Sequence, residues 1–194
     1  MLEKSDNEII IMAIPRGGVV IGDIIASSLG AELDIVVSRK IGAPHNPELA
    51  IGAVMHDGSF FPNEHLIRTL NVQQEYINEQ IFVQEKEIQR RLLRFRGSKQ
   101  YVLMNKIVIL VDDGIATGAT MIAAIRWLGG QQPKTLMVAV PVAPKDTFDR
   151  LKEEQKVDQV IVLFLPVAFS AVGEFYKDFS QVSDEEVIEI MRRY

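Results

Sequence analysis

The chain contains no cysteine, and its 194 residues include only three histidines, His45, His56 and His65. The absence of cysteine excludes disulfide bonds, thiolate nucleophiles and Cys-ligated zinc or iron–sulfur sites. The histidines are scattered and lack the close spacing that metal ligands show. The chemistry of the protein must therefore come from carboxylates, hydroxyls, cations and backbone amides.

No apolar run is long enough to suggest a membrane protein. The longest, Val160 to Phe169, is far shorter than the ~20 residues of a transmembrane helix, and Pro166 interrupts it. The first eight residues, MLEKSDNE, are polar and cannot form the apolar core of a signal peptide. We therefore expect a cytoplasmic protein with no membrane partner.

The composition is that of a soluble globular protein, with 47% apolar and 24% charged residues. A net charge of −5 argues against general nucleic-acid binding, although it leaves room for a local basic site. The length suffices for one domain that buries roughly 70% of the surface of its unfolded chain. The chain has no internal repeat and no low-complexity linker, so we expect a single domain over residues 1–194.

Short runs rich in Ile and Val predict five buried strands: Ile9–Ile14, Asp34–Ser38, Ile107–Val111, Thr135–Val140 and Val157–Leu165. Helical patterns lie between most of these runs, at Val19–Leu29, Gly118–Leu128 and Pro144–Glu154. This alternation predicts an α/β fold with a mostly parallel, twisted sheet flanked by helices. In such sheets ligands bind beyond the carboxyl ends of the strands.

One region departs from the alternation and predicts an insertion at about residues 55–104. Glu48–Phe61 indicates a hairpin that turns at Asp57-Gly58. Asn63–Phe95 then indicates one or two helices, with apolar residues at near-heptad intervals: Ile77, Ile81, Ile88, Leu92 and Phe95. Such a helix covers a sheet face or pairs with a second subunit, and it favours a homodimer. We expect the basic tract RRLLRFRGSK, residues 90–99, to be a solvated face.

The segment VDDGIATGAT, residues 111–120, lies between an apolar strand and a helix. Gly114 and Gly118 allow successive backbone N–H groups to converge on an anion. The hydroxyls of Thr117 and Thr120 add donors, and the N-terminus of the following helix adds its positive dipole. The pattern indicates a site for a phosphomonoester.

Two carboxylates, Asp112 and Asp113, stand directly before this loop and would repel a phosphate that they faced. At the end of a strand they can instead accept hydrogen bonds from vicinal hydroxyls, or bind Mg²⁺ directly or through water. A ribose 5-phosphate presents both groups, a phosphate at one end and a diol nearby. We therefore expect the acids to bind the diol and the loop to bind the phosphate of the same ligand.

These residues resemble the phosphoribosyl-diphosphate (PRPP) motif of type I phosphoribosyltransferases, in which two acids follow an apolar strand and precede a Thr-Gly-x-Thr loop. The resemblance implies that Asp112 and Asp113 hold the ribose and a Mg²⁺ cofactor. It also implies that the 5-phosphate of PRPP is bound by the loop residues Gly114, Ile115, Ala116, Thr117, Gly118, Ala119 and Thr120.

Two further segments are similar to the same family. AIPRGGVVIG, residues 13–22, resembles the first loop, which binds pyrophosphate through backbone amides and often a basic side chain. VVSRKIGAPHNPELAIGAV, residues 36–54, resembles a segment of adenine-type enzymes and, more closely, a poorly characterised branch of predicted phosphoribosyltransferases. The resemblance implies a diphosphate site made by Arg16, Gly17, Gly18, Arg39 and Lys40. The alternative is that Arg39 and Lys40 are solvated residues at the edge of a sheet.

The implied reaction moves the 5-phosphoribosyl group of PRPP to a nitrogen nucleophile, expected to be a nucleobase, and releases diphosphate. Its expected catalytic residues are Asp112, Asp113, Arg16 and Lys40. A C-terminal hood at about residues 166–194 would receive the base. Its aromatic residues either stack on that base or simply pack the segment: Phe169, Phe175, Tyr176 and Phe179.

Three features depart from the family pattern. Ala116 stands where hypoxanthine-type enzymes carry an acid, which leaves no candidate general base. Helical patterns occupy the interval between Gly52 and Ile107, where the family has a flexible loop over the site. The first strand begins within ten residues of Met1, without the preceding helix of many relatives.

Two alternatives to an enzyme therefore stay open. One is a PRPP- or nucleotide-sensing regulatory protein on the same fold. The other is a nucleotide-binding scaffold that dimerises through the helix at residues 72–96. The joint presence of Arg16, Arg39, Lys40, Asp112 and Asp113 favours catalysis, because a sensor need not hold the leaving diphosphate.

Overall fold

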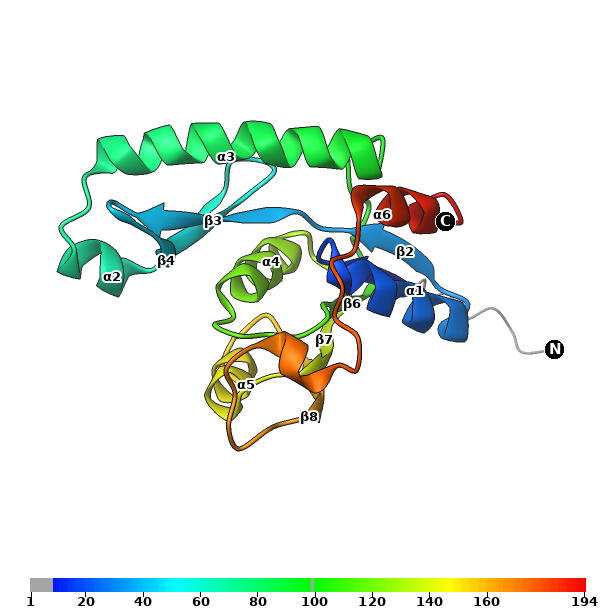
Figure 1. Cartoon of the computed structure of the whole chain (residues 1–194). Helices are drawn as coiled ribbons and strands as arrows, with labels where there is room; N and C mark the ends of the chain where they lie inside the picture. The colour runs from blue at the N-terminus through cyan, green and yellow to red at the C-terminus, as the bar shows by residue number, and fades with distance from the viewer. Residues whose placement is uncertain (1–8, 99) are drawn as a thin grey trace.

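The computed structural model describes residues 9–98 and 100–194, so the polar residues 1–8 and Lys99 lie outside the described part (Figure 1). Five strands form the central sheet, in the order β2-β1-β6-β7-β8, and each neighbouring pair is parallel. These strands are β1 Ile9–Ala13, β2 Glu32–Ile35, β6 Ile107–Val111, β7 Thr135–Val142 and β8 Gln159–Phe164. The predicted α/β sheet is confirmed.

The sequence of β6, IVILV, fits the middle of this sheet, between β1 and β7. Val108, Leu110 and Val111 are all 0% exposed. A parallel strand that is covered on both faces needs apolar side chains at successive positions rather than at alternate ones. Burial of β6 therefore fixes the acidic pair that follows it at the carboxyl edge of the sheet.

Helices cover both faces of the central sheet, and the side chains of β1 show the division. Ile10 and Met12 pack in the cluster that includes α4 Ala119–Gly130 and α5 Lys145–Lys152. Ile11 and Ala13 pack in the cluster that includes α1 Gly17–Leu29 and α6 Asp184–Met191. Successive strand residues point to opposite faces, so one short strand joins two cores.

A second sheet is antiparallel, in the order β3-β4-β5, and consists of β3 Ser38–Ala43, β4 Asn46–Met55 and β5 Phe60–Pro62. The predicted turn at Asp57-Gly58 joins β4 to β5 and is confirmed. The predicted strand Asp34–Ser38 is wrong in its extent, because its two ends belong to β2 and β3. Val36 and Val37 between them are buried, and a continuous apolar run gives no signal of the break.

The predicted helical region contains two helices, α2 Glu64–Thr69 and α3 Gln74–Phe95. Figure 1 shows α3 lying along the β3–β4 hairpin. Its buried side chains belong to the same core cluster as those of α1 and α6: Ile77, Ile88, Leu92 and Phe95. The apolar face of α3 therefore covers a sheet face within the chain, which is the first of its two predicted roles.

The C-terminal segment returns to the carboxyl edge of the central sheet. It contains a short 3-10 helix, η1 Val172–Phe175, and then α6, which lies beside α1 and one end of α3 (Figure 1). A capping box begins α6, because Ser183 and Glu186 exchange side-chain and backbone hydrogen bonds there. Among the described residues, no helix combines the length and the apolar content needed to cross a membrane.

Neighbouring leucines on α3 test how firmly the helix is docked. Leu92 is 0% exposed and Leu93 is 55% exposed. Leu92→Ala should lower the free energy of unfolding by about 2–5 kcal/mol, because it leaves a cavity in the core that α3 covers. Leu93→Ala should change it by less than about 0.5 kcal/mol. Urea unfolding monitored by circular dichroism measures both, and equal effects would mean that α3 is not anchored by this face.

Candidate functional site

The carboxyl ends of β1 and β6 bring two loops into close contact. A Cβ atom on Gly17 would lie 1.8 Å from Oδ2 of Asp113, and one on Gly18 would lie 3.0 Å from Cα of Asp112. No side chain larger than hydrogen fits either position without displacing the acidic pair. The two adjacent glycines are therefore what allows the first loop and the acids to meet.

A cavity of about 440 Å³ opens where these loops meet the start of β3. It is lined by seven of the fourteen residues predicted to bind the donor, from segments far apart in the sequence: Arg16, Gly17, Arg39, Lys40, Asp112, Asp113 and Thr120. Thr117 and Ala119 of the predicted phosphate loop line another cavity, which also includes Lys40. The adjacent Gly18 packs against Asp112 from the first turn of α1. Three motifs that were separate in the sequence thus face one space.

Asp112 and Asp113 are half-buried at the rim of this cavity, and Oδ1 of Asp112 accepts a hydrogen bond from the backbone N–H of Asp113, at 2.9 Å. Burial raises the pKa of both carboxyls, and the charge of Asp113 raises that of Asp112 further. An ionised pair in this position is stabilised by hydroxyl donors or a cation. The arrangement is suited to a polyhydroxylated ligand.

The side chain of Tyr176 connects the C-terminal segment to this pair, because its hydroxyl donates a hydrogen bond to the backbone carbonyl of Asp113. Burial, followed by the charges of the two aspartates, raises the pKa of Tyr176 to about 12. The hydroxyl therefore remains a donor throughout the ordinary pH range. Sequence reasoning considered this tyrosine only as an aromatic surface.

The predicted phosphate loop ends at the N-terminus of α4. Gly118 has φ 76° and its carbonyl accepts the N–H of Ile122 at 2.8 Å, while no side chain caps the helix. The amides of Ala119 and Thr120 lie in the first turn, where N–H groups have no intrahelical partner. They can donate to an anion together with the side chains of Thr117 and Thr120.

The other side of this loop is held by hydrogen bonds from α5. The Thr147 hydroxyl donates to the carbonyl of Ala116 at 2.8 Å, and Arg150 donates to the carbonyl of Thr117 at 2.7 Å. Ile115 has a buried side chain and donates its own N–H to Val142. Gly114 is packed so closely that a Cβ atom would lie 2.5 Å from Val172. Ile115 therefore anchors the loop, while Thr117 is exposed and Ala119 and Thr120 are partly exposed.

Arg39 and Lys40 were predicted to follow a strand, but they lie within β3. The chain leaves the parallel sheet after Ile35 and pairs with β4, which the continuous apolar sequence did not reveal. Arg39 Nε donates to Gln84 Oε1 of α3 at 3.0 Å, and Lys40 is exposed. Arg16 lies 3.6 Å from Asp184 of α6, measured between NH1 and Oδ1. All three cations remain at the cavity.

Two polar lining residues were missed by the sequence analysis, Ser38 and Arg91. Arg91 belongs to the tract that was expected to be a solvated face, and that expectation is wrong for this residue. The tract curves around α3, so its cations point in several directions. Only the packing of α3 on the hairpin turns Arg91 toward the site. Ser38 belongs to no sequence pattern that would indicate a ligand-binding role.

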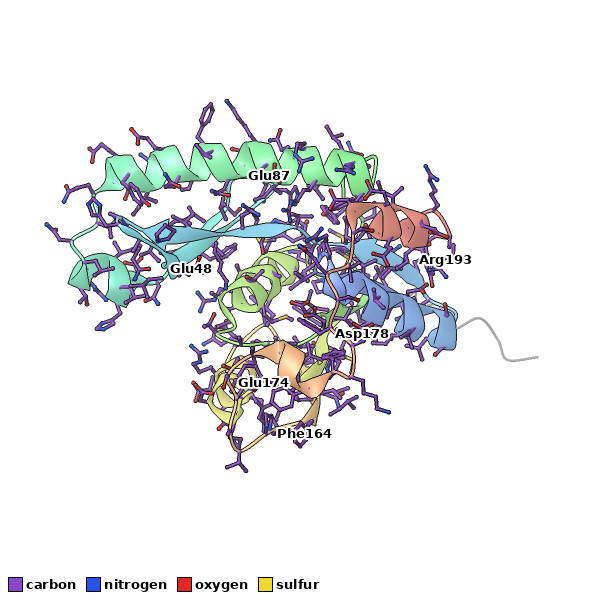
Figure 2. The ribbon with its side chains drawn as sticks, in the orientation of Figure 1. Glu48, Glu87, Phe164, Glu174, Asp178 and Arg193 are labelled. Carbon is purple, nitrogen blue, oxygen red and sulfur yellow. The ribbon has the colours of Figure 1, made fainter. Side chains whose placement is uncertain are left out.

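A second cavity of about 560 Å³ adjoins the first and shares Arg16, Gly17 and Asp113 with it. Its remaining walls come from α1 and the C-terminal segment. Tyr176 and Phe179 have ring centroids 5.1 Å apart on one side, and Val20 and Ile21 line another. Figure 2 shows the labelled Asp178 on this segment beside α1. The cavity has the apolar walls that suit a planar ring.

The carboxylates present fit a metal ion that is shared with a substrate. In residues 9–98 and 100–194, no group of three or more His, Asp or Glu side chains is placed to hold a metal. Mg²⁺ often binds through only one or two carboxylates, with phosphate oxygens and water completing its shell. Asp112 and Asp113, next to a phosphate-binding loop, match that donor set.

Comparison with known proteins agrees with the geometry. A family model described as phosphoribosyl transferase domain matches residues 1–176. Two Mycobacterium tuberculosis proteins, MT0597 of strain CDC 1551 and Rv0571c of strain H37Rv, have names that provisionally describe them as phosphoribosyl transferases. Each is 37% identical over 194 residues, which is 100% of this chain and 43% of the relative. The chain thus spans less than half the length of these curated relatives.

Among solved structures, TT1426 from Thermus thermophilus is 39% identical, with a TM-score of 0.80. The match covers 95% of this chain and 86% of that chain. The chain therefore belongs to the phosphoribosyl transferase domain family, and the resemblance of its sequence motifs to that family is confirmed.

Gly17→Ala tests the contact between the two loops. The new Cβ would overlap the Asp113 carboxylate, so we expect the free energy of unfolding to fall by about 1–3 kcal/mol. Gly130→Ala is the matched control, because a Cβ at the end of α4 meets no atom within 4 Å. It should instead raise stability by about 0.5–1 kcal/mol. If both variants were stabilised in urea unfolding, the proposed close approach would be incorrect.

Proposed function

We propose that the protein transfers the 5-phosphoribosyl group of PRPP to a nitrogen nucleophile, with release of diphosphate. The observation that carries this proposal is the meeting of three family-like motifs at one cavity of about 440 Å³. The motif at residues 111–120 offers carboxylates for the ribose and amides and hydroxyls for the 5-phosphate, and the other two motifs offer cations for the diphosphate. PRPP presents these groups in one molecule.

In this proposal the donor is held along the carboxyl edge of the central sheet. The first turn of α4 and the hydroxyls of Thr117 and Thr120 bind the 5-phosphate. Asp112 and Asp113 accept hydrogen bonds from the ribose hydroxyls. Arg16 and Lys40, with the amides near Gly17 and Gly18, face the diphosphate. Because the loops are fixed by backbone packing, the sugar is oriented before reaction.

The reaction breaks the bond between the anomeric carbon and the diphosphate oxygen, and the bonding electrons leave with the diphosphate. The acceptor nitrogen forms a new bond to the same carbon, and an acceptor N–H releases its proton to water. Positive charge develops on the sugar as in other glycosyl transfers, and the nearby Asp113 stabilises it. Arg16 and Lys40 stabilise the negative charge of the leaving group. Mg²⁺ held by the aspartates and the substrate would supply additional charge neutralisation.

Asp113→Asn tests the role of Asp113, because it removes the negative charge of the side chain but keeps its shape. We expect kcat/KM for PRPP to fall by about 100-fold or more, measured as diphosphate release with Mg²⁺ and a panel of bases. Asp149→Asn on the exposed side of α5 is the control and should leave it unchanged. Unaltered rate and PRPP affinity in Asp113→Asn would contradict the proposal.

The same assay separates the enzyme from the sensing alternative. A regulatory protein would bind PRPP saturably and release no diphosphate with any base. In the described residues between Gly52 and Ile107, a hairpin and two helices occupy most of the interval where the family has a flexible loop, which favours that alternative. A single domain, a cytoplasmic location and a homodimer remain predictions.

We further propose that the 560 Å³ cavity receives the acceptor and that it disfavours carboxylate-bearing acceptors. Asp113, Asp178 and Glu186 line it, against Arg16 as the cation among its described lining residues. An acceptor with its own carboxylate would face like charges, whereas a neutral ring with N–H donors would not.

Matched acceptor pairs test this charge preference. Uracil against orotate, and nicotinamide against nicotinate, differ chiefly by a carboxylate. The neutral member should have at least about a tenfold larger kcat/KM in each pair, because like-charge repulsion opposes its partner. Asp178→Asn keeps an oxygen to accept the Ser180 N–H, and it should reduce the difference in kcat/KM within each pair. A preference for orotate or nicotinate would refute this reading of the cavity.

A further inference from the structure

Helix α3 contributes a cation to the donor cavity that no family-like motif includes. Arg91 lines the cavity, and its side chain is 28% exposed. Its Nε donates to Oε1 of Glu87, one turn earlier, at 2.9 Å. A guanidinium has five N–H donors, so this bond leaves the terminal nitrogens available to a ligand.

One face of α3 is organised around the cavity. Gln84, Glu87 and Arg91 are spaced three and four residues apart and therefore lie along the same side of the helix. Gln84 holds Arg39, and Glu87 holds Arg91. Hydrogen bonds from Arg90, and then from Arg91, lower the pKa of Glu87 to about 2, so it remains ionised at any working pH. Figure 2 shows Glu87 near the middle of α3.

Ser38 provides an independent observation at the same cavity. Its hydroxyl oxygen is buried and has no hydrogen-bond partner, although the residue lines the cavity and is partly exposed. An orphaned hydroxyl is costly unless something satisfies it. Rotation about χ1 toward the cavity would break no existing hydrogen bond. A ligand oxygen in the cavity would provide the missing partner.

The charges lining the cavity identify the class of ligand. The lining contains four cations, Arg16, Arg39, Lys40 and Arg91, and two carboxylates, Asp112 and Asp113. The acids lie at the end of β6, whereas Arg39, Arg91 and Ser38 come from β3 and α3 on the side of the hairpin. The positive side suits a multiply charged anion, and planar guanidinium groups bind phosphate oxygens bidentately.

We propose that Arg91 and Ser38, together with Arg39 and Lys40, form the subsite for the diphosphate group of the donor. This inference rests on the proposed function and adds that a fixed helix supplies charge to the leaving group. A mobile loop is then not needed for that purpose. Glu87 is a positioning residue, because it touches Arg91 rather than the ligand.

Isothermal titration with inorganic diphosphate and Mg²⁺ tests the subsite without any acceptor. Arg91→Ala should weaken diphosphate binding about tenfold or more, since a hydrogen-bonded charge is lost. Arg91→Lys should recover part of the affinity, because it keeps the charge but not the fork of donors. Ser38→Ala should weaken binding about three- to tenfold.

Arg90→Ala is the matched control. Arg90 also pairs with Glu87, at 2.8 Å, but its side chain is 53% exposed and it does not line the cavity. It should change diphosphate affinity less than twofold. Ribose 5-phosphate is the second control, since its binding should be the same in the wild type and Arg91→Ala. Thermal melting confirms that each variant is folded.

The outcomes separate this inference from the proposed function. If the wild type binds diphosphate and Arg91→Ala binds it as tightly as Arg90→Ala does, the subsite is wrong while the proposed function stands. An equal loss in both arginine variants would assign the effect to their shared pairing with Glu87 and would also overturn the subsite. If the wild type binds neither diphosphate nor PRPP, both proposals fail.

Discussion

The site depends on the close contact between the first loop and the end of β6. These strands are parallel neighbours, so their carboxyl ends reach the same edge of the sheet. The contact is possible because Gly17 and Gly18 have no side chains where Asp113 and Asp112 lie. A larger residue at Gly17 would displace the Asp113 carboxylate, and one at Gly18 would press on the backbone at Asp112.

The surrounding elements hold these two loops from different directions. Helix α5 fixes the carbonyls of Ala116 and Thr117, which leaves the opposite side of the phosphate loop for a ligand. Tyr176 fixes the carbonyl of Asp113 from the C-terminal segment. Since the loops carry few side chains of their own, their shape is set by hydrogen bonds to the backbone. Preorganised amides of this kind are effective toward anions because they need little rearrangement on binding.

The hairpin and α3 add a wall on the remaining side. Burial of the apolar face of α3 fixes the orientation of the helix, and this orientation decides which of its many charged residues face the cavity. Arg90 and Arg91 are adjacent in the chain and share Glu87, yet only Arg91 lines the donor cavity. Packing of the apolar face of α3 therefore determines which of its charged side chains contribute to the electrostatics of the cavity. An insertion that looks structural in the sequence also shapes the site.

The sequence alone determined the α/β class, four of the five strands of the central sheet and the motifs around Arg16, Arg39 and Asp112. These features are local: apolar runs make buried strands, and glycines beside hydroxyls make an anion loop. Tertiary structure decided the rest. The break between β2 and β3 is hidden because Val36 and Val37, which lie at the break, are themselves buried and apolar, so periodicity carries no signal. The roles open to Arg91, Ser38 and Tyr176 depend on contacts across tens of residues, and such contacts exist only once the chain has folded.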